Sequence, residues 1–315
     1  MKKFAAVLGL MTLDVLLVTP RAAESATRPP PLVIIVMENK PASRIVGNPA
    51  APFMNAFIAR GVRFTNYEEG EAKGPSLPDY LQLAAGSSCG RYSDKVEPGD
   101  AGISSSCTTT LWNQLEKSGR SWGVYMDGMP SPCSSAITHD DTATDGQYAL
   151  KHNPAIPFEV IYGDQALCRS HVLPYASFDP AKLPDVSFVS PNICNDMHGS
   201  RSAKWTNCRS GSSALIMRGD RWLADRVPEM LANGAQVFVT FDESGTLYAV
   251  AAGPGLRAGT TDDTAYTHYS FLAAVEDRFG LPRLEAASSA KPLPLNSFPS
   301  PSAAEARGPV GSRLR

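Results

Sequence analysis

A serine beside a helix start is the first residue of this chain that could carry out chemistry. Ser76 stands between Pro75 and Pro78 in the stretch GPSLPDYLQLAAG, ahead of an apolar helical pattern that stops at Gly86. Two interpretations are open. Ser76 can cap this helix, with Asp79 three residues later completing a capping box. It can also act as a nucleophile towards a phosphate bound by the free N–H groups of the helix N-terminus.

Carboxylate and amide side chains follow two strongly apolar runs. Glu38 and Asn39 come directly after LVIIVM, and Asp242 and Glu243 come directly after QVFVTF. Each of them alone could be only a helix cap or a turn residue. Together they are the hard oxygen ligands that a divalent cation takes, with Mg²⁺, Mn²⁺, Ca²⁺ and Zn²⁺ all open. A cation beside Ser76 would lower the pKa of its hydroxyl and polarise a phosphoryl oxygen.

A second group of polar residues follows the apolar run VSFVS. The stretch PNICNDMHG contains Asn192, Asp196 and His198, and the later stretch YTHYS places His268 at the start of a helix. A solvated loop and a helix-start residue are the simpler interpretations of these residues. Their coincidence with the acidic pairs favours one common site.

An alternation of strand and helix patterns predicts how these residues are positioned. Strands are expected over residues 32–37, 62–67, 122–126, 186–190, 236–241 and 246–252, and helices over 51–61, 109–118, 220–233 and 268–279. This order is typical of an α/β layered domain, with a mostly parallel sheet and helices on both faces. Ligands bind such sheets beyond the carboxyl ends of the strands, so we expect the polar residues to meet at one rim.

The composition favours a compact domain and excludes some partners. The chain has 315 residues, 43% of them hydrophobic, and a net charge of −2. Both terminal segments are basic, so the middle is acidic, which argues against nucleic acid as a partner. We expect the domain over residues 32–285, with an irregular insertion over 127–185 across one edge of the sheet. An Ala/Ser/Pro-rich flexible tail is expected over 286–315.

The N-terminus and the cysteines indicate a secreted protein. Residues 1–26 resemble a signal peptide, with two lysines before an apolar stretch that Asp14 interrupts, which argues against a retained membrane anchor. The six cysteines favour up to three disulfides in an oxidising compartment. Cys194 with Cys208 and Cys107 with Cys133 are the two candidate pairs. The oligomeric state stays open.

Seven short blocks, in order over roughly residues 32–284, closely resemble the bacterial phosphoesterase family of the alkaline phosphatase superfamily. They are VIIVMEN, PSLPDYL, KHNP, PDVSFVSPNICNDMH, GDRWL, VTFDE and YTHYSFLAAVEDRFGLP. That family contains secreted acid phosphatases, phosphatidylinositol-3-phosphate phosphatases and phospholipases C. The resemblance implies an alkaline-phosphatase-like layered fold and hydrolysis of phosphate esters.

The resemblance also implies roles for individual residues. Ser76 takes the place of the nucleophile, and one metal ion falls to Glu38, Asn39, Asp242 and Glu243. Asp196, His198 and His268 stand where two-metal relatives hold a second ion, and either histidine would protonate the leaving oxygen or activate water. Substrate binding falls to Asp79, Lys151, His152 and Asn192.

Two departures from the family pattern surround Ser76. Gly74 and Asp79 stand where the family usually has His and Asn. An Asp carboxylate beside a phosphate repels it unless it is protonated or bound to metal. The sequence therefore predicts a secreted, metal-dependent phosphomonoesterase that acts through a phosphoserine. A phospholipase C-type phosphodiesterase and a non-catalytic binding protein on a degenerate hydrolase scaffold are the alternatives.

Overall fold

A central eight-stranded sheet organises the chain. The computed structural model describes residues 28–71, 74–95, 105–136, 147–201 and 204–295. The strand order is β5-β4-β6-β1-β7-β8-β2-β9. The bounds are β1 Leu32–Met37, β2 Val62–Phe64, β4 Trp122–Met126, β5 Val172–Pro174, β6 Val186–Ser190, β7 Gln236–Phe241, β8 Val250–Ala252 and β9 Thr260–Asp262. Only β8 runs antiparallel to its neighbours, so the sheet is mostly parallel, as predicted.

The strand β1 forms the middle of the sheet because its side chains are apolar on both faces. All six of its residues are buried, and β6 and β7 pair with it on either side. A continuous apolar run of this kind suits a parallel strand covered by helices on both faces. Met37 is in register with Phe241, so the residues that follow β1 and β7 emerge side by side.

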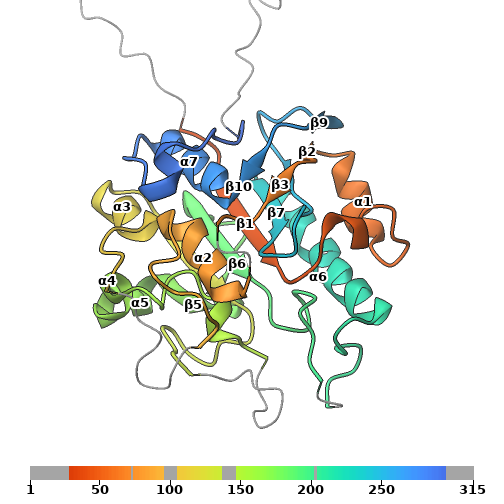
Figure 1. Ribbon diagram of the computed structural model, residues 1–315, viewed down its shortest axis with the longest axis horizontal. Helices are drawn as coiled ribbons and strands as arrows, with labels where there is room; N and C mark the ends of the chain where they lie inside the picture. Colours follow the sequence, from red (N-terminus) through yellow and green to blue (C-terminus); the bar gives the residue numbers. More distant parts are fainter. Residues whose placement is uncertain (1–27, 72–73, 96–104, 137–146, 202–203, 296–315) are drawn as a thin grey trace, which may run out of the picture.

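Helices cover the sheet in two groups, on opposite sides of the central strands (Figure 1). One group packs α1 (Pro52–Ile58) against α6 (Ser213–Ala232), and the other packs α2 (Ser76–Ala85) against α7 (His268–Phe279) and α3 (Leu111–Lys117). Asp220 of α6 accepts hydrogen bonds from the N–H groups of Phe53 and Met54 at 3.0 and 2.8 Å. This carboxylate caps the N-terminus of α1 from another helix, which gives the Asp of the GDRWL block a structural role.

Several predicted boundaries moved. The strand expected over residues 62–67 divides into β2 and a separate strand, β3 (Tyr67–Glu68), which pairs with β10 (Tyr266–Thr267). The helix α6 starts earlier than predicted because Ser212 caps it, accepting the N–H of Leu215. Of residues 246–252, only β8 pairs as a strand of the sheet.

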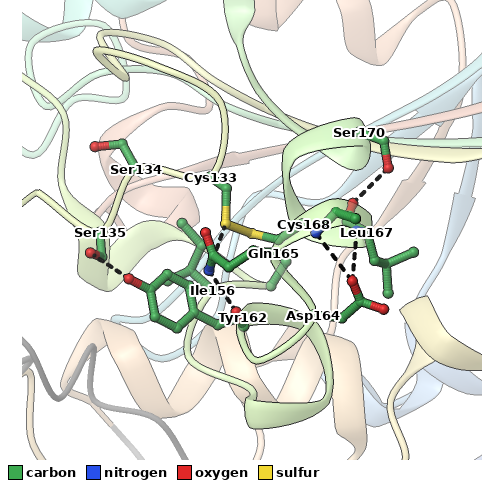
Figure 2. Close-up of a disulfide and its surroundings, with 12 residues drawn as sticks. Cys133, Ser134, Ser135, Ile156, Tyr162, Asp164, Gln165, Leu167, Cys168 and Ser170 are labelled. Carbon is green, nitrogen blue, oxygen red and sulfur yellow. Dashed lines mark hydrogen bonds between the residues drawn. A yellow bond between two sulfur atoms is a disulfide. The ribbon is translucent and has the colours of Figure 1, made fainter.

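The segment over residues 127–185 contains more regular structure than the sequence predicted. It contributes α4 (Glu159–Tyr162), α5 (Gln165–His171) and β5, which extends the sheet beyond β4. A disulfide joins Cys133 to Cys168 of α5, and the Gln165 amide lies against the Cys133 sulfur (Figure 2). The segment is thus fixed to the edge of the sheet; residues 137–146 lie outside the described part.

The cysteine pairing is partly as predicted. Cys194 pairs with Cys208, which confirms the local bridge. The predicted pair of Cys107 with Cys133 is wrong, because Cys107 pairs with Cys89. Cys133 instead donates its N–H to the Val172 carbonyl, which places it beside α5.

The two ends of the chain fall largely outside the described residues. The predicted signal peptide, residues 1–26, lies there entirely. Of the predicted tail, residues 286–295 are described and pack on the domain, with Ala287, Leu293 and Leu295 buried. Within the described ranges, none of the helices has the length and apolarity to span a membrane.

Candidate active site

The ends of β1 and β7 bring Glu38 and Asn39 together with Asp242 and Glu243. The Asp242 N–H donates to the Met37 carbonyl at 3.0 Å, and the Asn39 N–H donates to Asp242 Oδ1 at 2.9 Å. The Asn39 side-chain amide donates to Glu243 Oε1. Asn39 has a φ of 50°, a left-handed conformation that Asn tolerates, and the chain turns there directly after the strand. The four residues predicted to hold metal therefore form one cluster.

Glu38 joins this cluster to the helix α2. Its Oε2 accepts a hydrogen bond from Ser76 Oγ at 3.1 Å, and its Oε1 accepts one from the Tyr80 hydroxyl at 2.6 Å. All three side chains are buried. Ser76 is the first residue of α2, and the preceding Pro75 provides no side-chain cap. The serine hydroxyl thus donates its hydrogen bond to the acidic cluster and does not cap the helix, so the capping interpretation is wrong.

Asp196 and His152 extend the cluster on the other side of Glu38. His152 Nε2 lies 3.3 Å from Glu38 Oε2, and His152 Nδ1 lies 3.2 Å from Asp196 Oδ2. The imidazole is buried and stacks on the Tyr80 ring. Glu38, His152 and Asp196 each offer a ligand atom, and these atoms all lie within 4.8 Å of one another. His152 thus lies among the ligand candidates, whereas the sequence analysis assigned it to substrate phosphate.

Burial of so many carboxylates raises their pKa values. Burial, followed by the charges of Asp242 and Asp196, places the pKa of Glu38 well above its ordinary value. Burial likewise raises the pKa values of Asp196 and Asp242, and burial with the Asp242 charge raises the pKa of Glu243 to about 7. Like charges held in a low dielectric destabilise one another unless a proton or a cation is shared between them.

The donor set fits a divalent cation. Burial, followed by the charge of Asp242, raises the pKa of Glu38, so these two buried carboxyl groups repel each other when both are ionised, and a shared proton or a cation removes that repulsion. Asn39 Oδ1 is buried without a hydrogen-bond partner among the described residues. An oxygen donor left over beside three carboxylates is what a hard cation requires. Glu38, Asn39, Asp242 and Glu243 would hold it.

Lys40 is a cationic residue of the site that the sequence analysis missed. Its ammonium donates to the Met197 carbonyl at 2.9 Å and to the Asn39 carbonyl at 3.2 Å. Burial lowers its pKa, whereas the charges of Asp196 and Glu38 raise it. A lysine that follows a strand is normally exposed to solvent. The fold instead buries Lys40 on the Met197 carbonyl, close enough to Asp196 and Glu38 for their charges to act on its pKa.

Lys151 and His198 line a less buried side of the site. Lys151 Nζ donates to Asp94 Oδ2 at 2.8 Å and lies 3.5 Å from His198 Nε2. Burial lowers the pKa of Lys151, but the Asp94 and Glu38 charges outweigh it and leave the pKa raised. The His198 N–H donates to Asp196 Oδ1 at 2.6 Å, which ties this loop to the metal-ligand candidates.

His268 is committed to the backbone. Its Nε2 lies 2.6 Å from the Asp242 carbonyl oxygen and donates to it, and its Nδ1 accepts from the Tyr67 hydroxyl at 3.0 Å. Burial lowers the pKa of this fully buried imidazole to about 4, so it is neutral. The expected role of His268 in proton transfer to the substrate does not fit, because both ring nitrogens are already engaged. It holds the Asp242 turn in place.

The two departures from the family pattern have physical explanations. At Gly74, φ is +57° and a Cβ atom would lie 2.2 Å from Glu243 Oε2, so a histidine there would strain the backbone and require the Glu243 side chain to move. Burial, followed by the charges of Asp242, Glu243 and Glu69, raises the pKa of Asp79 to about 9. Asp79 is therefore a neutral acid at pH 7, and the expected repulsion of phosphate does not arise.

Asn192 forms a turn. Its Oδ1 accepts the N–H groups of Cys194 and Asn195, both at 3.1 Å. This turn directly precedes Asp196, and it positions the loop that carries Asp196 and His198 beside Glu38 and His152. The structure thus engages Asn192 Oδ1 within its own loop. The expected contact of Asn192 with substrate stays a prediction.

Comparisons with known sequences find similar proteins. Residues 48–252 match the sequence model of the Phosphoesterase family. An acid phosphatase of Aspergillus fumigatus is 28% identical over 248 residues, which cover 73% of this chain and 51% of that protein. A phosphatidylinositol-3-phosphatase of Mycobacterium tuberculosis is 29% identical over 277 residues, covering 83% of this chain and 81% of that protein. The chain thus spans about half the length of the acid phosphatase it matches.

Solved structures share the fold. A protein of the alkaline phosphatase superfamily from Vibrio parahaemolyticus superposes with a TM-score of 0.53 at 12% identity, covering 84% of this chain and 70% of that one. A 2-O GAG sulfatase superposes with a TM-score of 0.54 at 13% identity, covering 87% and 75%. These neighbours show an alkaline-phosphatase-like layered fold.

Proposed function

Because this chain belongs to the Phosphoesterase family, we propose that it is a metal-dependent hydrolase of phosphoric monoesters. The observation that carries the proposal is the position of Ser76. Its hydroxyl lies at the start of α2 and donates to Glu38 within a cluster of carboxylates. A candidate nucleophile, a carboxylate that accepts its hydrogen bond and a set of hard ligands are therefore in contact.

The cation would be held by Glu38, Asn39, Asp242 and Glu243. When bound, it would lower the pKa of the serine hydroxyl and polarise a phosphoryl oxygen. The identity of the ion stays open among Mg²⁺, Mn²⁺, Ca²⁺ and Zn²⁺. A second ion at Asp196, His198 and His268 is not favoured, because His268 is engaged by Asp242 and Tyr67.

The residues of the chain supply the remaining chemistry. Ser76 Oγ attacks phosphorus and passes its proton to the Glu38 carboxylate, while the bond from phosphorus to the alcohol oxygen breaks. His198 is the better placed of the two histidines to protonate the leaving oxygen, because it is less buried than His268. Its Nδ1 lies 2.8 Å from the Gly199 carbonyl oxygen, and its Nε2 faces Lys151 at 3.5 Å. Water then cleaves the phosphoserine, and the serine recovers its proton.

Three considerations support monoesters over the phosphodiester alternative. Lys151 offers a positive charge to the extra negative charge of a terminal phosphate. The two relatives described above are called an acid phosphatase and a phosphatidylinositol-3-phosphatase. Asp79 is neutral and can donate a hydrogen bond to the phosphoryl group.

The three disulfides support an extracytoplasmic location.

Release of p-nitrophenol from p-nitrophenyl phosphate, with and without a chelator, tests the proposal. We expect release that a chelator abolishes and that added divalent metal restores. A folded protein that binds phosphate but releases no product under any of the four metals would instead be the non-catalytic binding protein.

A further inference from the structure

The backbone N–H directly after the proposed nucleophile already has an anionic partner. Leu77 N–H donates to Asp94 Oδ1 at 3.0 Å, and Lys151 Nζ donates to Asp94 Oδ2 at 2.8 Å. One carboxylate therefore bridges a helix N-terminal amide and a lysine. Asp94 comes from the loop that follows α2, so this helix is capped by the chain that leaves its other end.

The same two donors suit a phosphate. An amide at a helix N-terminus and a lysine ammonium are both common ligands of phosphoryl oxygens. Leu77 is adjacent in sequence to Ser76, so an oxygen held by its N–H lies beside the attacking hydroxyl. The proposed substrate group and the Asp94 carboxylate thus need the same hydrogen-bond donors.

Asp94 differs from the carboxylates of the proposed metal cluster in its exposure and in its position on a loop. Its side chain is 33% exposed, whereas Glu38 and Asp242 are fully buried. It lies on a loop that includes Gly90, at a φ of 73°, and Tyr92, which is 76% exposed. The Cys89–Cys107 disulfide tethers the start of this loop and leaves Asp94 several residues away from the tether. The carboxylate can therefore leave its donors without disturbing the domain core.

We propose that Asp94 is an internal competitor that occupies the phosphoryl subsite and is displaced by phosphoryl oxyanions. The inference rests on the proposed function for the identity of the ligand. In the free protein Asp94 satisfies Leu77 N–H and Lys151. Substrate takes over both donors, and the return of Asp94 helps inorganic phosphate to leave. The residue therefore sets the affinity of the site for phosphate.

A different role for Asp94 predicts the opposite result. If Asp94 only caps α2 or orients Lys151, its removal disorders the donors and weakens phosphate binding. If it competes, its removal strengthens phosphate binding. The sign of the change separates the two roles.

Calorimetric titration of the full chain with inorganic phosphate in the presence of Mg²⁺ measures this sign. Asp94→Asn removes the charge while its amide oxygen can still accept from Leu77, and we expect about a tenfold lower Kd for phosphate. Asp94→Glu keeps the charge and should bind phosphate as weakly as the parent. Asp179→Asn is the matched control, since Asp179 also bridges a backbone N–H, of Ala181, and a lysine, Lys182.

An unchanged or higher Kd in a folded Asp94→Asn protein overturns the inference, as does tight binding by Asp94→Glu. Absence of binding by both the parent and Asp94→Asn overturns it too. The proposed hydrolase function fails separately. A parent that hydrolyses esters while Asp94→Asn binds phosphate unchanged refutes only the competitor. Tighter phosphate binding without any hydrolysis refutes only the catalyst.

Discussion

Ser76 Oγ donates a hydrogen bond to Glu38 Oε2 at 3.1 Å, and both side chains are fully buried. The contact joins the start of α2 to the end of β1, which are 38 residues apart in the chain. A buried carboxylate that accepts a serine proton is both a base and a ligand candidate. The proposed nucleophile is therefore oriented before any substrate arrives.

Ser76→Ala should remove turnover and leave the fold intact. We expect kcat to fall by about a thousandfold or more, since the reacting atom is gone. The free energy of unfolding should drop by only about 1 kcal/mol, because Glu38 keeps its contacts with Tyr80 and His152. Ester hydrolysis and urea unfolding measure the two effects. Ser170→Ala, on the exposed side of α5 (Figure 2), is the control and should change neither. Normal turnover by Ser76→Ala would exclude it as the nucleophile.

Asp242→Asn should weaken metal binding. The substitution removes one of the negative charges that the proposed cation would meet beside Glu38 and Glu243, so we expect at least about a tenfold higher Kd for Mn²⁺. Elemental analysis of the parent should find one equivalent after saturation. Asp164→Asn is the matched control, because Asp164 caps α5 and Asn caps as well as Asp. Equal metal content in the parent and Asp242→Asn would contradict the assignment.

The stability of the metal-free protein should fall as the pH rises. The folded-state pKa of Asp79 is raised to about 9 from an ordinary value of 3.8, so between these values the folded state binds a proton that the unfolded state lacks. Linkage then lowers the free energy of unfolding by up to about 1.4 kcal/mol per pH unit across this window. Asp79→Asn removes the titration. Its advantage over the parent in urea unfolding with EDTA should therefore grow between pH 5 and pH 8. An advantage of equal size at both pH values would show that Asp79 is already ionised in the folded state.

His268→Gln should act through the metal site rather than through proton transfer. The imidazole donates to the Asp242 carbonyl and accepts from Tyr67, so its loss loosens the turn that carries Asp242 and Glu243. We expect a higher Kd for metal, with kcat recovering at saturating metal and the pH–rate profile keeping its shape. A lost limb of the pH–rate profile would instead make His268 a proton donor or acceptor.

The sequence could predict which residues meet at the rim of the sheet, because the apolar pattern of the strands is visible in the sequence itself. The apolar runs before Glu38 and Asp242 determine both the strands and the position where their polar residues emerge. The roles of His152 and Asp94 could not be found in this way. His152 ends a short 3-10 helix and Asp94 lies on a loop, and the positions of both depend on tertiary contacts, namely stacking on Tyr80 for His152 and the reach of the loop after α2 for Asp94. The wrong partner for Cys107 has the same cause, since pairing depends on how loops return.

The substrate preference depends on the charge that Lys151 meets. A terminal phosphate carries one more negative charge than a diester, and the Lys151 ammonium lies where that charge would be bound in the proposed site. We therefore expect kcat/KM for p-nitrophenyl phosphate to exceed that for p-nitrophenyl phosphorylcholine. Lys151→Gln should lower kcat/KM for the monoester more than for the diester, because only the monoester loses a charge pair. Binding of substrate displaces Asp94 from Lys151 in this scheme. Lys151→Gln should therefore lower the ratio of the monoester kcat/KM to the diester kcat/KM in the Asp94→Asn background as well. A tenfold preference for the diester, about 1.4 kcal/mol in transition-state binding, would instead favour the phosphodiesterase.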